Sequence, residues 1–126
     1  MKNDIDQIRK TVHAYFDGVS TKSYEKFLES WHPEARMNFV KDGQASSVGR
    51  DFWEGWCKQD SDNEQTTKAW IESIDIKGSI AVVRSKMIRD TPDTIYDFTD
   101  LLTLLKNGEE KWVIMSKAYN SVITKK

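Results

Sequence analysis

The first half of the chain has its apolar residues at helical spacing. Between residues 4 and 20 they recur at steps of three and four, at Ile5, Ile8, Val12, Tyr15, Phe16 and Val19. This spacing places them on one face of an amphipathic helix. A second helix is predicted from Ser23, and His32-Pro33 should end it, because the residue before a proline resists helical backbone angles. After Gly49 a third, shorter helix is predicted over 50–58, with aromatic residues on two adjacent faces.

The second half of the chain changes to the residue pattern of β-strands. Four segments rich in β-branched and aromatic residues are separated by turn signals and span 67–76, 79–88, 94–106 and 111–123. In hairpin order these strands form an antiparallel meander. A short strand is also predicted over 36–40, and the polar run 59–65 is predicted to be a loop. Helices followed by strands indicate a single α+β domain over 1–126, with three N-terminal helical segments packed on a curved, mostly antiparallel sheet.

Composition and charge exclude several classes of partner. Lys and Arg number 19 and Asp and Glu number 20, so the net charge is −1. Nucleic acids and anionic membranes select a clear basic excess, so we expect neither as a partner. Cys57 is the single cysteine and fits a reducing compartment. The charged start of the chain and the lack of about 18 consecutive apolar residues predict neither a signal peptide nor a membrane span, so we expect a cytoplasmic protein.

Three segments of the chain carry a family resemblance. They are Tyr-Phe-Asp-Gly at 15–18, Phe-Leu-Glu-Ser-Trp-His-Pro-Glu-Ala at 27–35 and Lys-Trp-Val-Ile-Met-Ser-Lys-Ala-Tyr at 111–119. With the order of the predicted elements, they resemble the nuclear transport factor 2-like superfamily of ketosteroid isomerase and scytalone dehydratase. Within it they look closest to the largely uncharacterised branch described as putative lumazine-binding. The resemblance spans nearly the whole chain and implies a cystatin-like cone with an internal pocket, whose convex sheet face often forms dimers.

The same resemblance does not imply steroid isomerisation. Tyr15 falls where ketosteroid isomerase keeps the tyrosine of its oxyanion hole. The position of that enzyme's base is Phe39, which can neither take nor give a proton. The aspartic acid that partners the tyrosine falls near Thr99, with Asp97 and Asp100 close by. The resembling segments are mainly structural, so they indicate the fold more strongly than the activity.

Several aromatic and polar residues are candidates for lining the pocket. A Tyr15 phenol at the mouth of a cavity can donate to a ligand oxygen, although a core tyrosine bonded to backbone or water has the same pattern. Trp31 and Trp56 come from helices predicted to cover the opening of the cone. There they either sandwich a flat ring or pack in the core. The predicted ligand-binding set is Tyr15, Trp31, Phe39, Trp56, Asp97 and Asn120.

The alternation of side chains decides which acidic residue faces the pocket. Within 94–106 successive side chains point to opposite faces, so without a bulge only one of Asp97 and Asp100 faces inward. Aligning on Gly108 favours Asp97, whose pKa would rise in such a hollow, and it turns Asn120 inward on the last strand. The alternative is that both acids lie at the rim or on a dimer surface. A shift of one residue would reverse these assignments.

No metal or cofactor site is expected. His13, His32 and Cys57 do not have zinc-site spacing. The acidic segment 60–64 resembles the start of a calcium loop but lacks that loop's glycine and its final glutamate. His32 ends a predicted helix, where a histidine commonly bonds the last carbonyls, although it can also act as a general base near neutral pH.

The leading hypothesis for function is the binding of an unidentified small, mostly apolar or aromatic ligand. The rival hypothesis is a small isomerase or dehydratase that uses Tyr15 with Asp97 or His32. A third is an interaction domain without a ligand, whose cavity is filled by its own side chains. We also expect a homodimer through the convex sheet face, because three helical segments cannot cover both faces of four long strands. The apolar residues predicted on that face are Trp70, Ile74, Ile76, Ile80, Val82, Tyr96, Phe98, Leu102 and Leu104.

Overall fold

Residues 3–59, 65–108 and 111–126 are described by the computed structural model, and within them lie three helices and six strands. In chain order these are α1 (Asp4–Thr21), α2 (Tyr24–Ser30), β1 (Trp31–Lys41), β2 (Gln44–Gly49), α3 (Phe52–Lys58), β3 (Thr66–Lys77), β4 (Ile80–Asp90), β5 (Thr94–Lys106) and β6 (Trp112–Lys125). The loop predicted over 59–65 and the calcium-like segment 60–64 fall mostly or wholly outside the described residues. No helix in the described part of the chain is long and apolar enough to cross a membrane.

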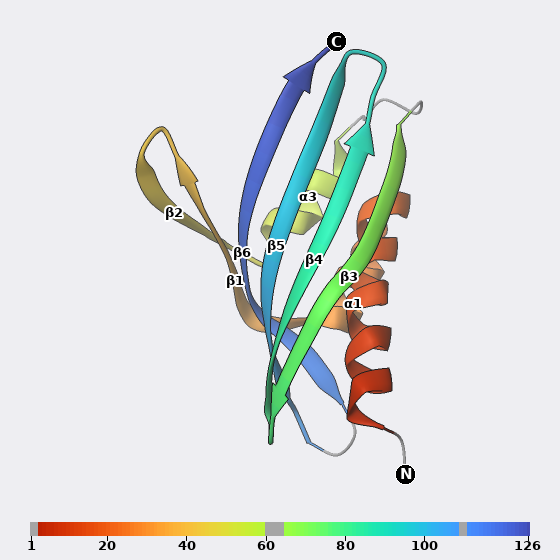
Figure 1. The fold of residues 1–126 in the computed structure, drawn as a ribbon, viewed down its shortest axis with the longest axis vertical. Helices are drawn as coiled ribbons and strands as arrows, with labels where there is room; N and C mark the ends of the chain where they lie inside the picture. Colours follow the sequence, from red (N-terminus) through yellow and green to blue (C-terminus); the bar gives the residue numbers. More distant parts are fainter. Residues whose placement is uncertain (1–2, 60–64, 109–110) are drawn as a thin grey trace.

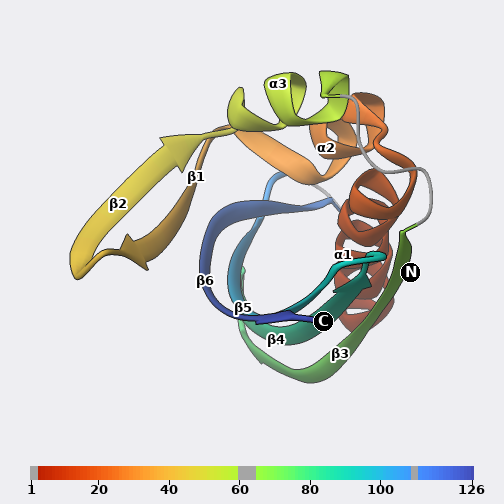
Figure 2. The ribbon, with the colours of Figure 1, turned by 90° about the horizontal axis from the view of Figure 1, so that it is seen from above.

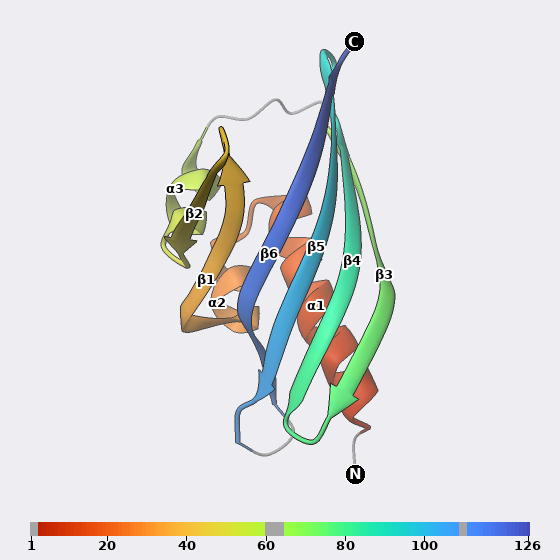
Figure 3. The same cartoon turned by 60° about the vertical axis from the view of Figure 1, so that its left-hand side comes forward.

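The predicted α+β class is confirmed by a curved, unclosed sheet with helices on its concave side. The strand order is β2-β1-β6-β5-β4-β3, and every neighbouring pair is antiparallel except β1 and β6 (Figure 1). Seen from above, β3 to β6 curve around α1, while α2 and α3 lie over the opening (Figure 2). The side view shows the helices on one side of the four long strands (Figure 3). This arrangement leaves the other face of the sheet without helices.

The core forms where the apolar face of α1 meets the inner face of the sheet. The helix buries its predicted stripe, including Ile8, Val12 and Tyr15, against the sheet core that holds Leu102 and Leu104. Each aliphatic side chain buried in this way contributes about 1.5–3 kcal/mol relative to its exposed state. Helix α1 contacts both β3 and β6, and it therefore spans the concave side from the edge strand β3 to the interior strand β6.

The β1–β2 hairpin differs from the sequence prediction. Helix α2 ends at Ser30, two residues earlier than expected, and β1 continues through His32 and Pro33. Strand β2 was not predicted at all. The turn between the strands uses Asp42 and Gly43, both with positive φ, which is the backbone of a type I′ hairpin turn. The hairpin projects away from the core (Figure 1), and β2 carries mostly small and polar residues with one core-packed valine, Val48, so it shows no apolar alternation.

The predicted side-chain register was wrong on β5, on the second half of β6 and on β3 after its bulge. On β5 the even-numbered residues face inward, so Asp100 and Leu102 are buried while Leu101 is exposed. On β6 a bulge at Met115 reverses the alternation, because Ile114 and Ser116 lie opposite consecutive residues of β5. A second bulge interrupts β3 between Ile71 and Ser73. The residues predicted outward that lie inward instead are Ile74, Ile76, Tyr96, Phe98, Leu102 and Leu104.

Candidate functional site

A cavity of about 130 Å³ lies between the helices and the inner face of the sheet. Helices α1 and α3 form one side of it and strands β1, β4, β5 and β6 form the other. The lining residues are Tyr15, Val19, Met37, Phe52, Trp53, Trp56, Met87, Arg89, Phe98, Asp100, Lys117 and Tyr119. Apolar walls with a few convergent polar groups are typical of a small-molecule site.

Three buried polar side chains meet at the wall of this cavity. The hydroxyl of Tyr15 donates to Asp100 Oδ2 over 3.1 Å, and Lys117 Nζ donates to the Tyr15 hydroxyl over 2.6 Å. Lys117 Nζ also lies 3.6 Å from Asp100 Oδ2. The three residues are 1%, 1% and 5% exposed in the order Tyr15, Asp100 and Lys117. They come from α1, β5 and β6, so the folded sheet assembles the cluster from residues far apart in the sequence.

Burial dominates the electrostatics of the cluster. It raises the pKa of Tyr15 well above its ordinary value, and the charge of Asp100 and the hydrogen bond to it raise that pKa further. It lowers the pKa of Lys117, and Asp100 opposes this through its charge and hydrogen bonding. The pKa of Tyr119 is also raised, first by burial and then by Asp100. The Tyr15 phenol is therefore a protonated donor at neutral pH, and the Lys117 ammonium is easier to deprotonate than a solvent-exposed one.

One oxygen of the cluster is left without a hydrogen bond. Asp100 Oδ1 is buried and has no partner among the described residues, and the same holds for Ser85 Oγ. Ser85 lies directly opposite Asp100 in the pairing of β4 with β5, so both side chains are on the inner face. An unsatisfied buried polar atom costs about 1–3 kcal/mol. A ligand that donates to Asp100 Oδ1 would remove that cost at this atom.

A cation lies at another part of the cavity lining. The Arg89 guanidinium is 5.3 Å from the centre of the Trp56 ring and 5.7 Å from that of Tyr96. Its Nη2 donates to Gln65 Oε1. Lys22 Nζ lies 4.6 Å from the same Trp56 ring. Both cations lie against the Trp56 ring, and cation–π attraction stabilises the ring in this position.

Two of the six predicted site residues line the cavity, Tyr15 and Trp56. Trp31 is buried in the core, with its ring centre 5.8 Å from that of Tyr15, and is not part of the lining. Phe39 packs against Tyr119 with ring centres 5.3 Å apart, on the far side of a lining residue. The aromatic helical cover therefore exists, but Trp31 supports it from within the core.

The two polar residues that were predicted to line the pocket from β5 and β6, Asp97 and Asn120, lie away from the cavity. Asp97 accepts from Lys86 Nζ in an ion pair that is partly exposed to solvent. Asn120 is exposed on β6. His32, the alternative base, uses Nδ1 to accept from the backbone N–H of Glu34 over 3.0 Å and is also not part of the lining. The positions of Asp97 and Asn120 follow from the even-numbered inner face of β5 and from the bulge in β6.

Sequence reasoning missed Lys117 and left Asp100 as the less favoured of two acids. One signal was available for Asp100, because it shares its parity with Leu102 and Leu104, and leucines spaced by two predict a buried face. No comparable signal exists for Lys117, since the bulge at Met115 changes the parity just before it. Trp53 was assigned no role, although it stacks on Phe27 at 4.2 Å between ring centres.

Comparisons with known proteins agree with this fold. A family model described as "Putative lumazine-binding" matches residues 3–120. A nuclear transport factor 2-like protein of unknown function from Shewanella baltica is 25% identical, with a TM-score of 0.75 and coverage of 94% of this chain and 93% of that one. A structure titled putative scytalone dehydratase from Novosphingobium aromaticivorans is 14% identical, with a TM-score of 0.76 and coverage of 97% and 87%.

A curated protein is also similar in sequence. The aldolase FrzH from a Cladobotryum species is 25% identical over 121 residues, which covers 94% of this chain and 92% of the relative. Both chains therefore align over nearly their full lengths.

Proposed function

Because the chain belongs to the family described as "Putative lumazine-binding" and has the nuclear transport factor 2-like fold, we propose that its cavity binds one small aromatic or apolar molecule carrying a polar oxygen. The observation that carries this proposal is the convergence of Tyr15, Asp100 and Lys117 on a cavity whose remaining walls are mostly apolar. The open cavity also favours a ligand over an interaction domain filled by its own side chains.

Two polar groups of the cluster, Lys117 and Asp100, have unused hydrogen-bonding capacity that suits such a ligand. An ammonium has three N–H donors, of which Lys117 directs one to Tyr15 and one toward Asp100, so a third is available to a ligand oxygen. Asp100 Oδ1 can accept from a ligand hydroxyl or N–H group. An apolar cavity of about 150 Å³ holds benzene, so a volume of about 130 Å³ suits roughly one ring.

A thermal-shift screen tests this proposal. The panel contains lumazine, phenols, aromatic ketones and aromatic carboxylic acids, with Trp fluorescence as the second signal because Trp53 and Trp56 line the cavity. A ligand at 100 times its Kd should stabilise the chain by about 2.7 kcal/mol. Asp100→Asn should weaken the binding of hydroxyl-bearing ligands, and the exposed Asn120→Asp serves as the control. A panel that moves neither signal would contradict the proposal.

A second candidate is an enzyme that moves a proton next to a carbonyl group. The specific observation is that a carboxylate with a free oxygen lies beside two donors, with Lys117 Nζ and Asp100 Oδ2 3.6 Å apart. Asp100 Oδ1 would take the proton, while the Lys117 N–H that is not directed to Tyr15 or Asp100 would stabilise the negative oxygen. The Cladobotryum relative is named an aldolase, and aldol reactions include the removal of a proton next to a carbonyl group. The acid–base partners expected earlier, Asp97 and His32, lie outside the cavity.

Deuterium exchange distinguishes an enzyme from a binding protein. We expect the chain to accelerate exchange, in D₂O, of the protons beside the carbonyl of 4-phenyl-2-butanone, followed by NMR. Asp100→Asn should abolish the acceleration even where ligand binding persists. Equal exchange with and without the protein would leave only the binding function.

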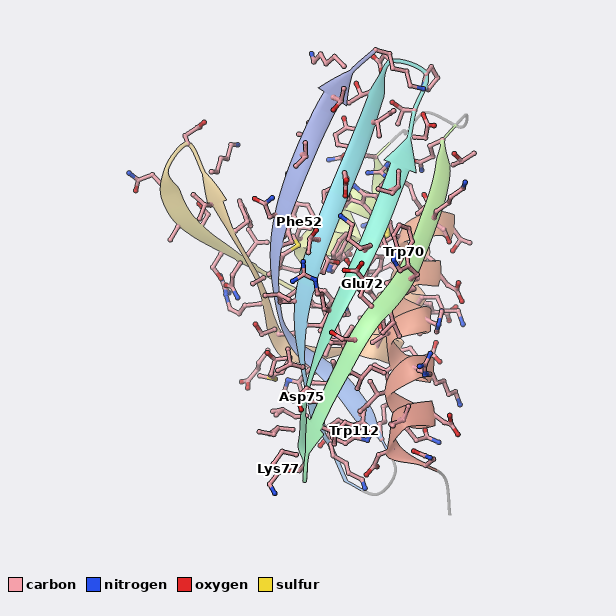
Figure 4. The ribbon with its side chains drawn as sticks, in the orientation of Figure 1. Phe52, Trp70, Glu72, Asp75, Lys77 and Trp112 are labelled. Atoms are coloured by element: carbon pink, nitrogen blue, oxygen red, sulfur yellow. The ribbon has the colours of Figure 1, made fainter. Side chains whose placement is uncertain are left out.

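We also propose that the chain forms a homodimer through the outer face of the sheet. Large apolar side chains are exposed on this face, among them Trp70, Ile80, Val82, Leu101 and Leu105. Figure 4 labels Trp70 and Glu72 on β3. Glu72 pairs with Arg84 over 3.1 Å, so ion pairs lie among the apolar residues. When this face pairs with the same face of a second chain through a two-fold axis, both faces are covered and no further apolar face is left exposed. Sedimentation at micromolar concentration tests this, and a persistent monomer would refute it.

A further inference from the structure

Lys117 is the only buried lysine in the described part of the chain. Its side chain is 7% exposed. The ammonium nitrogen lies 5.2 Å, 5.3 Å and 4.8 Å from the ring centres of Tyr15, Trp53 and Tyr119. It also lines the cavity. A primary amine held by aromatic rings at the wall of an accessible cavity is placed as a nucleophile rather than as a surface charge.

We propose that Lys117 forms an imine with its ligand, so that the cavity takes small aldehydes or ketones. This inference rests on the proposed function, since it requires the cavity to bind an oxygen-bearing molecule. It adds the substrate class and a covalent role for Lys117.

The neighbouring groups supply each proton transfer that the reaction needs. The Lys117 ammonium first gives a proton to the Asp100 carboxylate, whose Oδ2 is 3.6 Å away. The free amine pair then forms a bond to the carbonyl carbon, and the carbonyl π pair moves to oxygen. That oxygen takes a proton from the new N–H through the Tyr15 hydroxyl, which lies 2.6 Å from Nζ. The product of this step is a neutral carbinolamine.

Loss of water completes the imine and restores the charges. Protonated Asp100 gives its proton to the carbinolamine hydroxyl, the C–O bond breaks, and water leaves. The nitrogen pair forms the C=N bond, which leaves a cationic iminium beside the Asp100 carboxylate. The sum is one ammonium and one carbonyl compound giving one iminium and one water, without any oxidant or reductant.

Two further features favour this chemistry. Burial lowers the pKa of Lys117, which increases the fraction of free amine at a given pH. The iminium keeps the positive charge near the faces of the Tyr15, Trp53 and Tyr119 rings, so cation–π attraction persists in the product.

Reductive trapping tests the proposal on the full chain. The protein is incubated at neutral pH with 4-phenyl-2-butanone or benzaldehyde and sodium cyanoborohydride, then measured by intact mass and peptide mapping. We expect one adduct per chain, located at Lys117. Lys117→Arg should lose that adduct, and Lys10→Arg, a change at an exposed lysine of α1, should keep it. The peptide map of the unaltered chain tests the site even where Lys117→Arg fails to fold.

The outcomes separate the two proposals. An adduct spread over exposed lysines, or one that survives Lys117→Arg, overturns the imine. A probe that raises the melting temperature but gives no adduct at Lys117 also overturns it, and leaves ligand binding in place. If no adduct forms and no ligand of the screening panel shifts the melting temperature, both proposals fail.

Discussion

Two Lys–Asp pairs on opposite faces of the sheet show how environment changes the role of the same two residue types. On the inner face, Lys117 and Asp100 have side chains that are 7% and 1% exposed and share the Tyr15 hydroxyl. On the outer face, Lys86 and Asp97 are 19% and 42% exposed, and Lys86 also donates to Thr99 over 3.0 Å. Exposed pairs contribute about 0–1 kcal/mol. Burial lowers the pKa of Lys117 in the inner pair, which is why the functional proposals depend on that pair.

The largest expected difference between the faces concerns apolar residues. Leu102→Glu should prevent folding, because Leu102 is fully buried and an unpaired charge there has no compensating partner. Val82→Glu, at a residue 47% exposed on the outer face, should leave the fold intact and disrupt the proposed dimer. Circular dichroism and sedimentation measure the two effects. A folded Leu102→Glu variant would show that the inner face has been misassigned.

The next largest effect concerns the buried ion pair. Lys117→Met leaves the Asp100 carboxylate buried without its cation, so the free energy of unfolding should fall by about 3–5 kcal/mol. Lys86→Met on the outer face should lower it by about 0–1 kcal/mol. Urea denaturation measures both. Adding Asp100→Leu to Lys117→Met should recover much of the loss, and additive losses would argue against direct coupling.

The pH dependence of stability should also reflect the inner cluster. The pKa of Lys117 is lowered from its ordinary 10.5, so the unfolded chain holds that proton longer and stability rises with pH between the folded and unfolded values. The pKa of Tyr15 is raised from its ordinary 10.0, so above that pH the unfolded chain loses the phenol proton first and stability falls. Tyr15→Phe should weaken the decline above pH 10.0, as followed by urea denaturation across pH. An unchanged decline would assign it to other groups.

The fold was predictable because its determinants are local. The stripe of α1 and the β-branched segments of the long strands each carry their own periodicity, and each was found close to its observed bounds. Strand β2 was not predictable in this way, since a hairpin that projects from the core needs no apolar face. Its stability comes from pairing with β1, which residue spacing does not reveal.

The site was only partly predictable because it depends on register. Tyr15 was identified from the stripe of α1, where parity along a strand plays no part. Asp100 and Lys117 depend on which face each strand residue occupies, and one extra residue at Met115 reverses that face. Nothing in the local residue pattern marks Met115 as the bulge. The inner charge cluster therefore emerges only when the strand pairing is known.

The smallest expected effect separates the two aspartates that alternation alone left open. Asp97→Asn removes the anion of a partly exposed pair, so it should cost about 0–1 kcal/mol and leave ligand affinity within about twofold. Asp100→Asn, which changes the oxygen at the cavity wall, should weaken a hydroxyl-bearing ligand by about 1.5–3 kcal/mol, the range for hydrogen bonds to charged groups. Fluorescence titration of both variants with the same ligand measures the difference. Loss of affinity in Asp97→Asn but not in Asp100→Asn would mean that the ligand contacts the outer face. Asp97 cannot face the cavity while Asp100 stays buried, because the two side chains point to opposite faces of the same strand.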